Sequence, residues 1–89
     1  MQKREVRIVN RRGLHARPSA MLVRLLSKFQ CSVALVLNGH RANARNIVAV
    51  MLLAAGMGAT ITIETSGADE SEAMSAMVNL INDGFGDPH

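Results

Sequence analysis

Residues 11–18, RRGLHARP, hold the side chains of this chain that are best suited to chemistry. His15 has ring nitrogens, and a neutral imidazole nitrogen can attack a phosphoryl group. Arg17 follows two residues later, and its planar guanidinium can hold two anionic oxygens at once. Cationic neighbours disfavour the imidazolium form, so we expect His15 to be neutral and nucleophilic at neutral pH. The segment therefore favours phosphoryl transfer onto His15.

A predicted helix must position these side chains. It begins near Ala16, with Pro18 in its first turn and Lys28 in its last. No Ser, Thr, Asp or Asn directly precedes it, so its first amides and its dipole are expected to attract the phosphoryl oxygens. Gly13 permits an unusual turn that exposes the His15 ring. The apolar stripe of this helix is expected to pack in the core, and it consists of Met21, Leu22, Leu25, Leu26 and Phe29. The alternative is that His15 is an ordinary surface histidine.

The remaining chain predicts alternating strands and helices. Four segments have strand patterns: residues 5–9, 31–37, 40–44 and 59–65. The first of them alternates around Val6 and Ile8. Asn38-Gly39 is the strongest two-residue hairpin signal, and it joins the second segment to the third.

Two further helices are expected. Asn46 can cap a short helix over residues 47–55, which Gly56 would end. Asp69 followed by Glu72 resembles a capping box for a final helix. The apolar stripe of that helix consists of Ala73, Met74, Met77, Leu80 and Ile81. The order β-α-β-β-α-β-α predicts one α+β domain over residues 1–89, with helices covering one face of a mainly antiparallel sheet.

The composition narrows the class of protein. A chain of 89 residues with 48% hydrophobic residues suits one small domain. It has no apolar run of membrane-spanning length, and its start, MQKREVRIVN, lacks the apolar stretch of a signal peptide. Cys31 is the only cysteine, which fits a reducing compartment. We therefore expect a cytoplasmic protein with no membrane insertion.

The charges are unevenly distributed. All ten Lys and Arg residues lie in residues 1–45, where Glu5 is the only acid, whereas residues 46–89 contain six acids. Either the fold interleaves the two halves, or it presents a basic face to an anionic ligand or an acidic partner. A basic half also suits a small nucleic-acid-binding domain, but two Phe and no Trp or Tyr argue against base stacking.

Other candidate sites are weaker. His40 and His89 are expected to face solvent, and Cys31 is expected to be a small buried hydrophobe. No grouping of His, Cys and carboxylates has metal-ligand spacing. The glycines of residues 56–58 precede a predicted strand, whereas a dinucleotide-binding loop must follow one.

Residues 13–19, GLHARPS, resemble the active-site motif of HPr, the histidine-containing phosphocarrier family of the bacterial phosphotransferase system. The chain length, the element order and residues 43–58, NARNIVAVMLLAAGMG, extend the resemblance over nearly the whole chain. It implies an open-faced β-sandwich of four antiparallel strands with three helices on one face. It also implies that His15 is phosphorylated on Nδ1, that Arg17 stabilises the phosphoryl group, and that no metal or organic cofactor takes part.

The resemblance further implies a carrier rather than an enzyme. Its donor would be phosphorylated enzyme I, charged from phosphoenolpyruvate, and its acceptor an enzyme IIA domain, with no nucleic acid as partner. The short helix after Asn46 is apolar almost all round, so part of it must be exposed. We expect Val50 and Leu53 to point inward. The residues expected to contact the partners are Ile47, Val48, Met51 and Leu52, with a positive rim from Arg24, Lys28 and Arg45. We expect a monomer.

The sequence also bears on the regulation, the downstream branch and the activity of the chain. Asn46 stands where the family has a regulatory serine, and an asparagine cannot accept a phosphate, so that control is not expected here. Residues 51–58 and 80–85 resemble the nitrogen-branch proteobacterial members more than the sugar-transport proteins, so sugar uptake and nitrogen regulation both stay open. A third possibility is a regulatory module that no longer transfers phosphate, although His15 and Arg17 argue against it.

Overall fold

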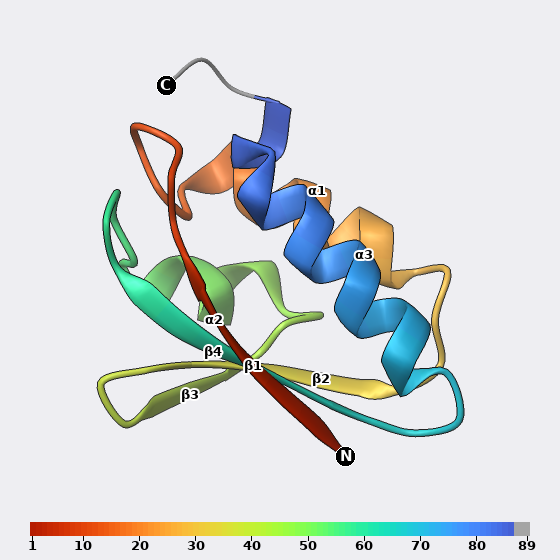
Figure 1. The fold of residues 1–89 in the computed structure, drawn as a ribbon. Coiled ribbons are helices and arrows are strands. Elements are labelled where there is room, and N and C mark those ends of the chain that lie inside the picture. Colours follow the sequence, from red (N-terminus) through yellow and green to blue (C-terminus); the bar gives the residue numbers. More distant parts are fainter. Residues whose placement is uncertain (87–89) are drawn as a thin grey trace.

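In a computed structural model that describes residues 1–86, a four-stranded antiparallel sheet carries three α-helices on one face (Figure 1). The strands are β1 (Gln2–Arg7), β2 (Ser32–Leu37), β3 (His40–Asn43) and β4 (Thr60–Ser66). The helices are α1 (Ala16–Leu26), α2 (Ile47–Leu52) and α3 (Glu70–Asn82), followed by a short 3-10 turn over Gly84–Gly86. The predicted open-faced β-sandwich and its element order are therefore confirmed. None of the helices in residues 1–86 is long and apolar enough to cross a membrane.

The sheet has the strand order β1-β4-β2-β3, with every neighbouring pair antiparallel. The hairpin between β2 and β3 turns at Asn38 and Gly39, whose φ angles are 50° and 82°. Positive φ at both central residues is what a type I′ turn requires, so the predicted hairpin is confirmed. The first strand starts earlier than expected and ends at Arg7, because its ladder with β4 begins where Gln2 faces Thr65.

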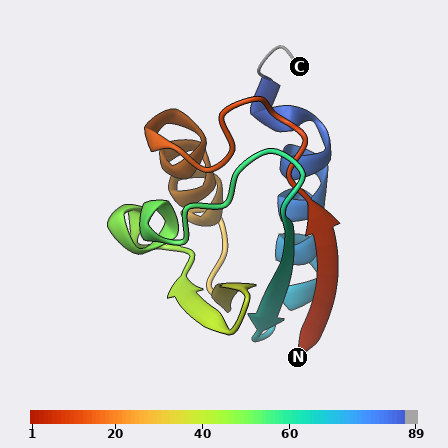
Figure 2. The same cartoon turned by 90° about the vertical axis from the view of Figure 1, so that its left-hand side faces the viewer.

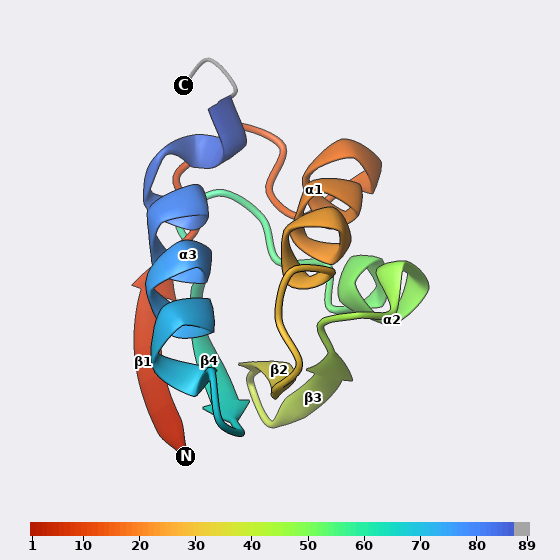
Figure 3. The same cartoon turned by 90° about the vertical axis from the view of Figure 1, so that its right-hand side faces the viewer.

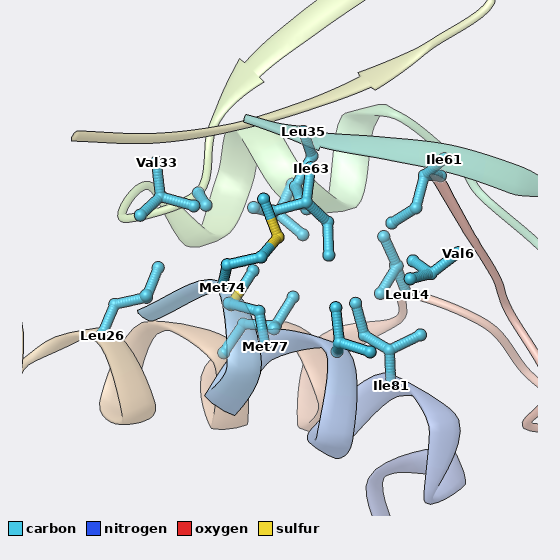
Figure 4. Packing of buried hydrophobic residues seen from close by; sticks show 14 of the residues in the cluster. Val6, Leu14, Leu26, Val33, Leu35, Ile61, Ile63, Met74, Met77 and Ile81 are labelled. Atoms are coloured by element: carbon cyan, nitrogen blue, oxygen red, sulfur yellow. The ribbon is translucent and has the colours of Figure 1, made fainter. Parts of the chain in front are cut away.

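The core fills the space between the sheet and the helices (Figure 4). Alternate side chains along each strand point inward, and they pack against the apolar stripes of the helices. Burial of one such side chain stabilises the fold by about 1.5–3 kcal/mol. The contributing side chains include Val33, Leu35, Ile61 and Ile63 from the sheet and Leu26, Met74, Met77 and Ile81 from the helices. The two stripes are thus core, as predicted.

The second helix is shorter than predicted. It ends at Leu52 instead of continuing to residue 55, so Gly56 does not terminate it. Ala54 has a left-handed backbone with φ of 55°, and the chain therefore reverses at Ala54, two residues before Gly56. Similarly, α1 ends at Leu26, so Lys28 lies beyond the last helical turn.

The expected capping box at the start of α3 is wrong. The Asp69 side chain makes no capping hydrogen bond to its own helix within residues 1–86. Its two carboxylate oxygens instead accept the backbone N–H groups of Gln30 at 2.8 Å and Cys31 at 2.9 Å. These bonds, led by that from Gln30, lower the pKa of Asp69 below its ordinary value. Asp69 therefore anchors the turn between α1 and β2.

Asp69→Asn is expected to lower the melting temperature at neutral pH, because an amide group presents a donor where the turn needs two acceptors. The lowered pKa means that the carboxylate stabilises the fold above about pH 4 and loses this effect as the pH falls through the folded-state pKa. The difference in melting temperature between variant and wild type should therefore shrink on acidification. Glu72→Gln, an exposed position in the first turn of α3, is the control. A difference that stays constant from pH 7 to pH 3 would contradict this account.

The two oppositely charged halves of the chain are partly interleaved. The carboxylate of Glu64 on β4 lies 3.6 Å from the Lys3 amino group and also pairs with Arg41. The hydrogen bond from Arg41 is the main reason that the pKa of Glu64 is lowered. The fold thus accounts for part of the charge asymmetry, while a separate group of arginines lies near the candidate site.

Candidate functional site

His15 occupies the N-cap position of α1. Its backbone is extended, with φ of −83° and ψ of −166°, and its carbonyl oxygen accepts the Ser19 N–H at 3.0 Å. The His15 side chain makes no capping hydrogen bond within the described residues, and it is half-buried. The absence of a capping side chain, predicted from the sequence, is confirmed. The His15 ring therefore lies at the N-terminus of α1 without capping its amide groups.

The loop before His15 is fixed by polar contacts that the sequence did not reveal. The Asn10 side-chain amide donates to the Gly13 carbonyl at 2.9 Å, and Asn10 is fully buried. The Ser19 hydroxyl, also buried, donates to the Leu14 carbonyl at 3.1 Å. Buried side-chain hydrogen bonds to the backbone restrict a loop to few conformations, although the Asn10 side-chain oxygen is buried without a hydrogen-bond partner within residues 1–86. Asn10, before the histidine, and Ser19, after it, thus both hold the loop that carries His15. Their sequence positions look like those of ordinary loop and helix-surface residues, and only their burial in the structure reveals this role.

Two segments far apart in the sequence lie side by side at this end of the molecule, the loop of residues 8–15 and the segment of residues 53–59 (Figure 2). The Leu14 N–H donates to the Ala55 carbonyl at 2.9 Å. Gly13 has φ of 65°, and an added Cβ there would lie 2.1 Å from the Ala55 oxygen. A glycine is required at this position for both reasons. The turn that places His15 is therefore built against the chain reversal after α2.

A shallow depression of about 250 Å³ adjoins the histidine. Its lining residues are Arg12, Leu14, His15, Met51, Ala54, Ala55 and Gly56. The predicted nucleophile, one of the flanking arginines and the end of α2 thus share one hollow. Arg11 and Arg17 are exposed, and Arg17 and Ala16 are the first two residues of α1. The geometry suits transient contact between the His15 ring and a group on a partner's surface.

The second helix presents an exposed apolar surface next to this hollow. Four of its side chains are exposed, namely Ile47 (37%), Val48 (60%), Met51 (39%) and Leu52 (78%). Val50 is fully buried, and Leu53 is half-buried. The Asn46 side chain accepts the Ala49 N–H at 3.1 Å, so the predicted cap is confirmed. Because α2 lies beside α1 (Figure 3), this surface and His15 belong to the same region of the molecule.

The other candidates do not form a second site. His40 is exposed, as expected, and His89 lies outside the described residues. Cys31 is buried, which is the main cause of the raised pKa of its thiol. Residues 1–86 contain no cluster of His, Cys, Asp and Glu side chains that could hold a metal ion. Arg45, which was expected in a positive rim, is half-buried, and its guanidinium donates hydrogen bonds to backbone carbonyls, so the rim stays a prediction.

Comparison with known proteins shows the family of this chain. Residues 2–83 match the family model described as the PTS HPr component phosphorylation site. The chain belongs to the HPr family. The phosphocarrier protein HPr of Cupriavidus necator is 47% identical over 87 residues, covering 98% of each chain. The crystal structure of HPr-C-His from Thermoanaerobacter tengcongensis superposes with a TM-score of 0.95 at 35% identity, covering 100% of both chains.

A second structure from that organism bears on assembly. The crystal structure of its HPr dimer gives a TM-score of 0.78 at 36% identity, covering 98% of this chain and 100% of that one. HPr proteins are phosphocarriers of the bacterial phosphotransferase system, so the chain is a carrier rather than an enzyme. The fold, the family and the carrier function inferred from the sequence are confirmed.

Proposed function

We propose that His15 of this HPr-family chain accepts a phosphoryl group on Nδ1 from phosphorylated enzyme I and passes it to an enzyme IIA domain. The observation that supports this most strongly is the placement of the half-buried His15 ring at the uncapped start of α1, beside the depression that Arg12 lines. Incubation with phosphoenolpyruvate and enzyme I tests the proposal. A single acid-labile phosphate adduct is expected, and a chain that stays unmodified would contradict it.

Each transfer is a displacement at phosphorus, in which the lone pair of the attacking nitrogen forms a bond to phosphorus and the donor group leaves with the electron pair of its own bond. The Nδ1–phosphorus bond of His15 forms as the bond to the donor breaks, and it breaks in turn when the acceptor attacks. The amide groups of the first turn of α1, near Ala16, and the Arg17 guanidinium stabilise the anionic oxygens. The helix dipole favours negative charge at the same end. No metal or organic cofactor is needed in this scheme.

Arg17 should govern the rate of transfer. Arg17→Lys keeps the charge but loses the planar fork that can hold two oxygens, so transfer should slow measurably. Arg17→Ala should slow it by about 100-fold, a typical effect of removing one group that stabilises developing charge. Rapid-quench measurement of phosphoryl transfer from enzyme I at saturating partner tests this, with Arg11→Ala as the control. Equal rates for wild type and both Arg17 variants would remove Arg17 from the mechanism.

The apolar surface of α2 is the proposed docking site for both partners. Ile47, Val48 and Met51 form a continuous patch with the highly exposed Leu52, and such patches mark interaction sites. A methionine adapts its shape to different partners, which suits a carrier that must bind two. Arg24 on α1 is exposed and can speed the encounter with acidic surfaces.

Asn46→Asp should separate docking from folding. Aspartate is as good an N-cap as asparagine, so the melting temperature should stay nearly unchanged. A negative charge beside the apolar patch and near the incoming phosphoryl group should weaken productive association with enzyme I. The concentration dependence of phosphoryl transfer and the melting temperature are measured on the same variant. Unchanged concentration dependence would show that α2 is not the docking surface.

The downstream branch and the state of assembly belong to the same proposal. We infer a cytoplasmic monomer, since a carrier that docks through α2 to two partners needs this surface free in each encounter. A related HPr forms a dimer, so light scattering at working concentrations is the appropriate check.

Transfer rates to sugar-specific and nitrogen-branch IIA domains would decide between sugar uptake and nitrogen regulation. Faster transfer to the nitrogen-branch IIA domain is expected.

A further inference from the structure

Arg45 makes an unusually complete set of contacts for a side chain near the surface. Its guanidinium donates to the backbone carbonyls of Leu26 at 2.8 Å, Phe29 at 2.8 Å and Cys31 at 2.7 Å. The residue is half-buried. A charged donor shared by three carbonyls gives strong hydrogen bonds with fixed directions, because the guanidinium is planar and rigid.

The acceptors lie at the C-terminal end of the helix that carries the candidate site. Leu26 is the last residue of α1, and Phe29 and Cys31 lie in the turn that leads to β2. The last carbonyls of a helix have no partner within it, and they form the negative end of its dipole. A cation bound there caps α1 at the end opposite His15.

The same residue is attached to the start of α2. Arg45 directly precedes Asn46, the N-cap of α2, whose side chain accepts the Ala49 N–H. The Arg45 N–H donates to the Asn43 side chain at 2.9 Å, and the Asn46 N–H donates to the Asn43 carbonyl at 3.0 Å. The backbone of Arg45 is thus fixed between β3 and α2, while its side chain is fixed to the last residue of α1 and to the turn that follows it. Figure 3 shows the two helices that it joins side by side.

We propose that Arg45 is a positioning residue that holds α2 against α1 and so preorganises the docking surface. The inference rests on the proposed docking through α2. A helix of six residues has little stability of its own, so its position depends on such contacts. Preorganisation lowers the entropy that a surface loses on binding. Loss of Arg45 should therefore weaken association with enzyme I and leave transfer within the bound complex unchanged.

The kinetic test uses Arg45→Met, which keeps an unbranched apolar side chain without its donors, and Arg45→Lys, which keeps the charge. Arg45→Met should raise the KM for transfer from enzyme I several-fold with kcat unchanged, and Arg45→Lys should fall between it and wild type. A lower kcat at unchanged KM would overturn the proposal, since it would place Arg45 in the transfer step.

Asp69→Asn provides a matched control, because within residues 1–86 the Asp69 carboxylate accepts its hydrogen bonds from Gln30 and Cys31 of the same turn, and Asp69 lies at the N-cap of α3 instead of next to α2 in the sequence. The comparison is made at temperatures where each variant is equally far below its own melting temperature. A KM increase for Arg45→Met that exceeds that for Asp69→Asn supports positioning. Equal increases would show that Arg45 only stabilises the turn, and the proposal would fail.

Hydrogen exchange measures the positioning without any partner. The Ala49 N–H, bonded to the Asn46 side chain, and the Val50 N–H, bonded to the Asn46 carbonyl at 3.0 Å, report on the start of α2. Arg45→Met should accelerate exchange at both amides more than Asp69→Asn does, and unchanged exchange would overturn the proposal. If exchange accelerates but Leu52→Ala leaves the KM unchanged, the positioning role is supported and docking through α2 is refuted instead.

Discussion

His15→Ala is expected to abolish phosphoryl acceptance while the chain still folds. The ring nitrogen is the nucleophile, and no other side chain of the site can replace it. The half-buried ring makes no capping hydrogen bond within the described residues, so its removal should change the melting temperature little. Transfer from phosphorylated enzyme I is followed by intact-mass measurement, and thermal unfolding is recorded on the same sample.

His40→Ala is the matched control, because His40 is exposed at the start of β3 and lies outside the depression beside His15. That variant should accept phosphate at the wild-type rate. An acid-labile adduct on His15→Ala, or the loss of acceptance in His40→Ala, would show that the nucleophile has been wrongly assigned.

Gly13→Ala is expected to reduce both stability and transfer strongly. The left-handed backbone alone costs an alanine about 1–2 kcal/mol. The new Cβ would also lie 2.1 Å from the Ala55 oxygen, so the bond from the Leu14 N–H to that oxygen must break or move. Because Leu14 directly precedes His15, the ring should be displaced with it. Even a small displacement of a reacting group slows a reaction considerably.

Gly39→Ala separates the two causes of this effect. Gly39 also has a left-handed backbone, with φ of 82°, but an added Cβ there meets nothing within 4 Å. It should lower the melting temperature modestly and leave transfer unchanged. If Gly13→Ala transfers phosphate as fast as Gly39→Ala at matched stability, the contact between the two loops does not position His15.

The fold was predictable where the signals are local. Alternating residues, the Asn38-Gly39 turn and the apolar stripes each determine structure over a few residues, and the order of elements follows from them. The predictions failed where a distant residue competes. Asp69 was expected to cap its own helix, but the backbone amides of Gln30 and Cys31, 39 and 38 residues away in sequence, bind its carboxylate instead. Arg45 was expected only to add positive charge beside the docking surface, whereas its guanidinium also binds backbone carbonyls that only the tertiary structure brings near.

The candidate site shows the same division. His15, Arg17 and the uncapped helix start are local features of one short segment, and the sequence was sufficient to propose them. The exposed residues of α2 were also predictable, because so short an apolar helix cannot be buried all round. By contrast, the burial of Asn10 and the contact of Gly13 with Ala55 depend on how two loops meet. No pattern along the chain encodes that meeting.

The most direct test of the central claim is to locate the phosphate on the wild-type chain. The protein is incubated with phosphoenolpyruvate and enzyme I, its intact mass is measured, and the modified nitrogen is identified by NMR of the phosphorylated imidazole. The account predicts one acid-labile phosphate, on Nδ1 of His15. A phosphate on His40 or His89, or no phosphate at all, would contradict it.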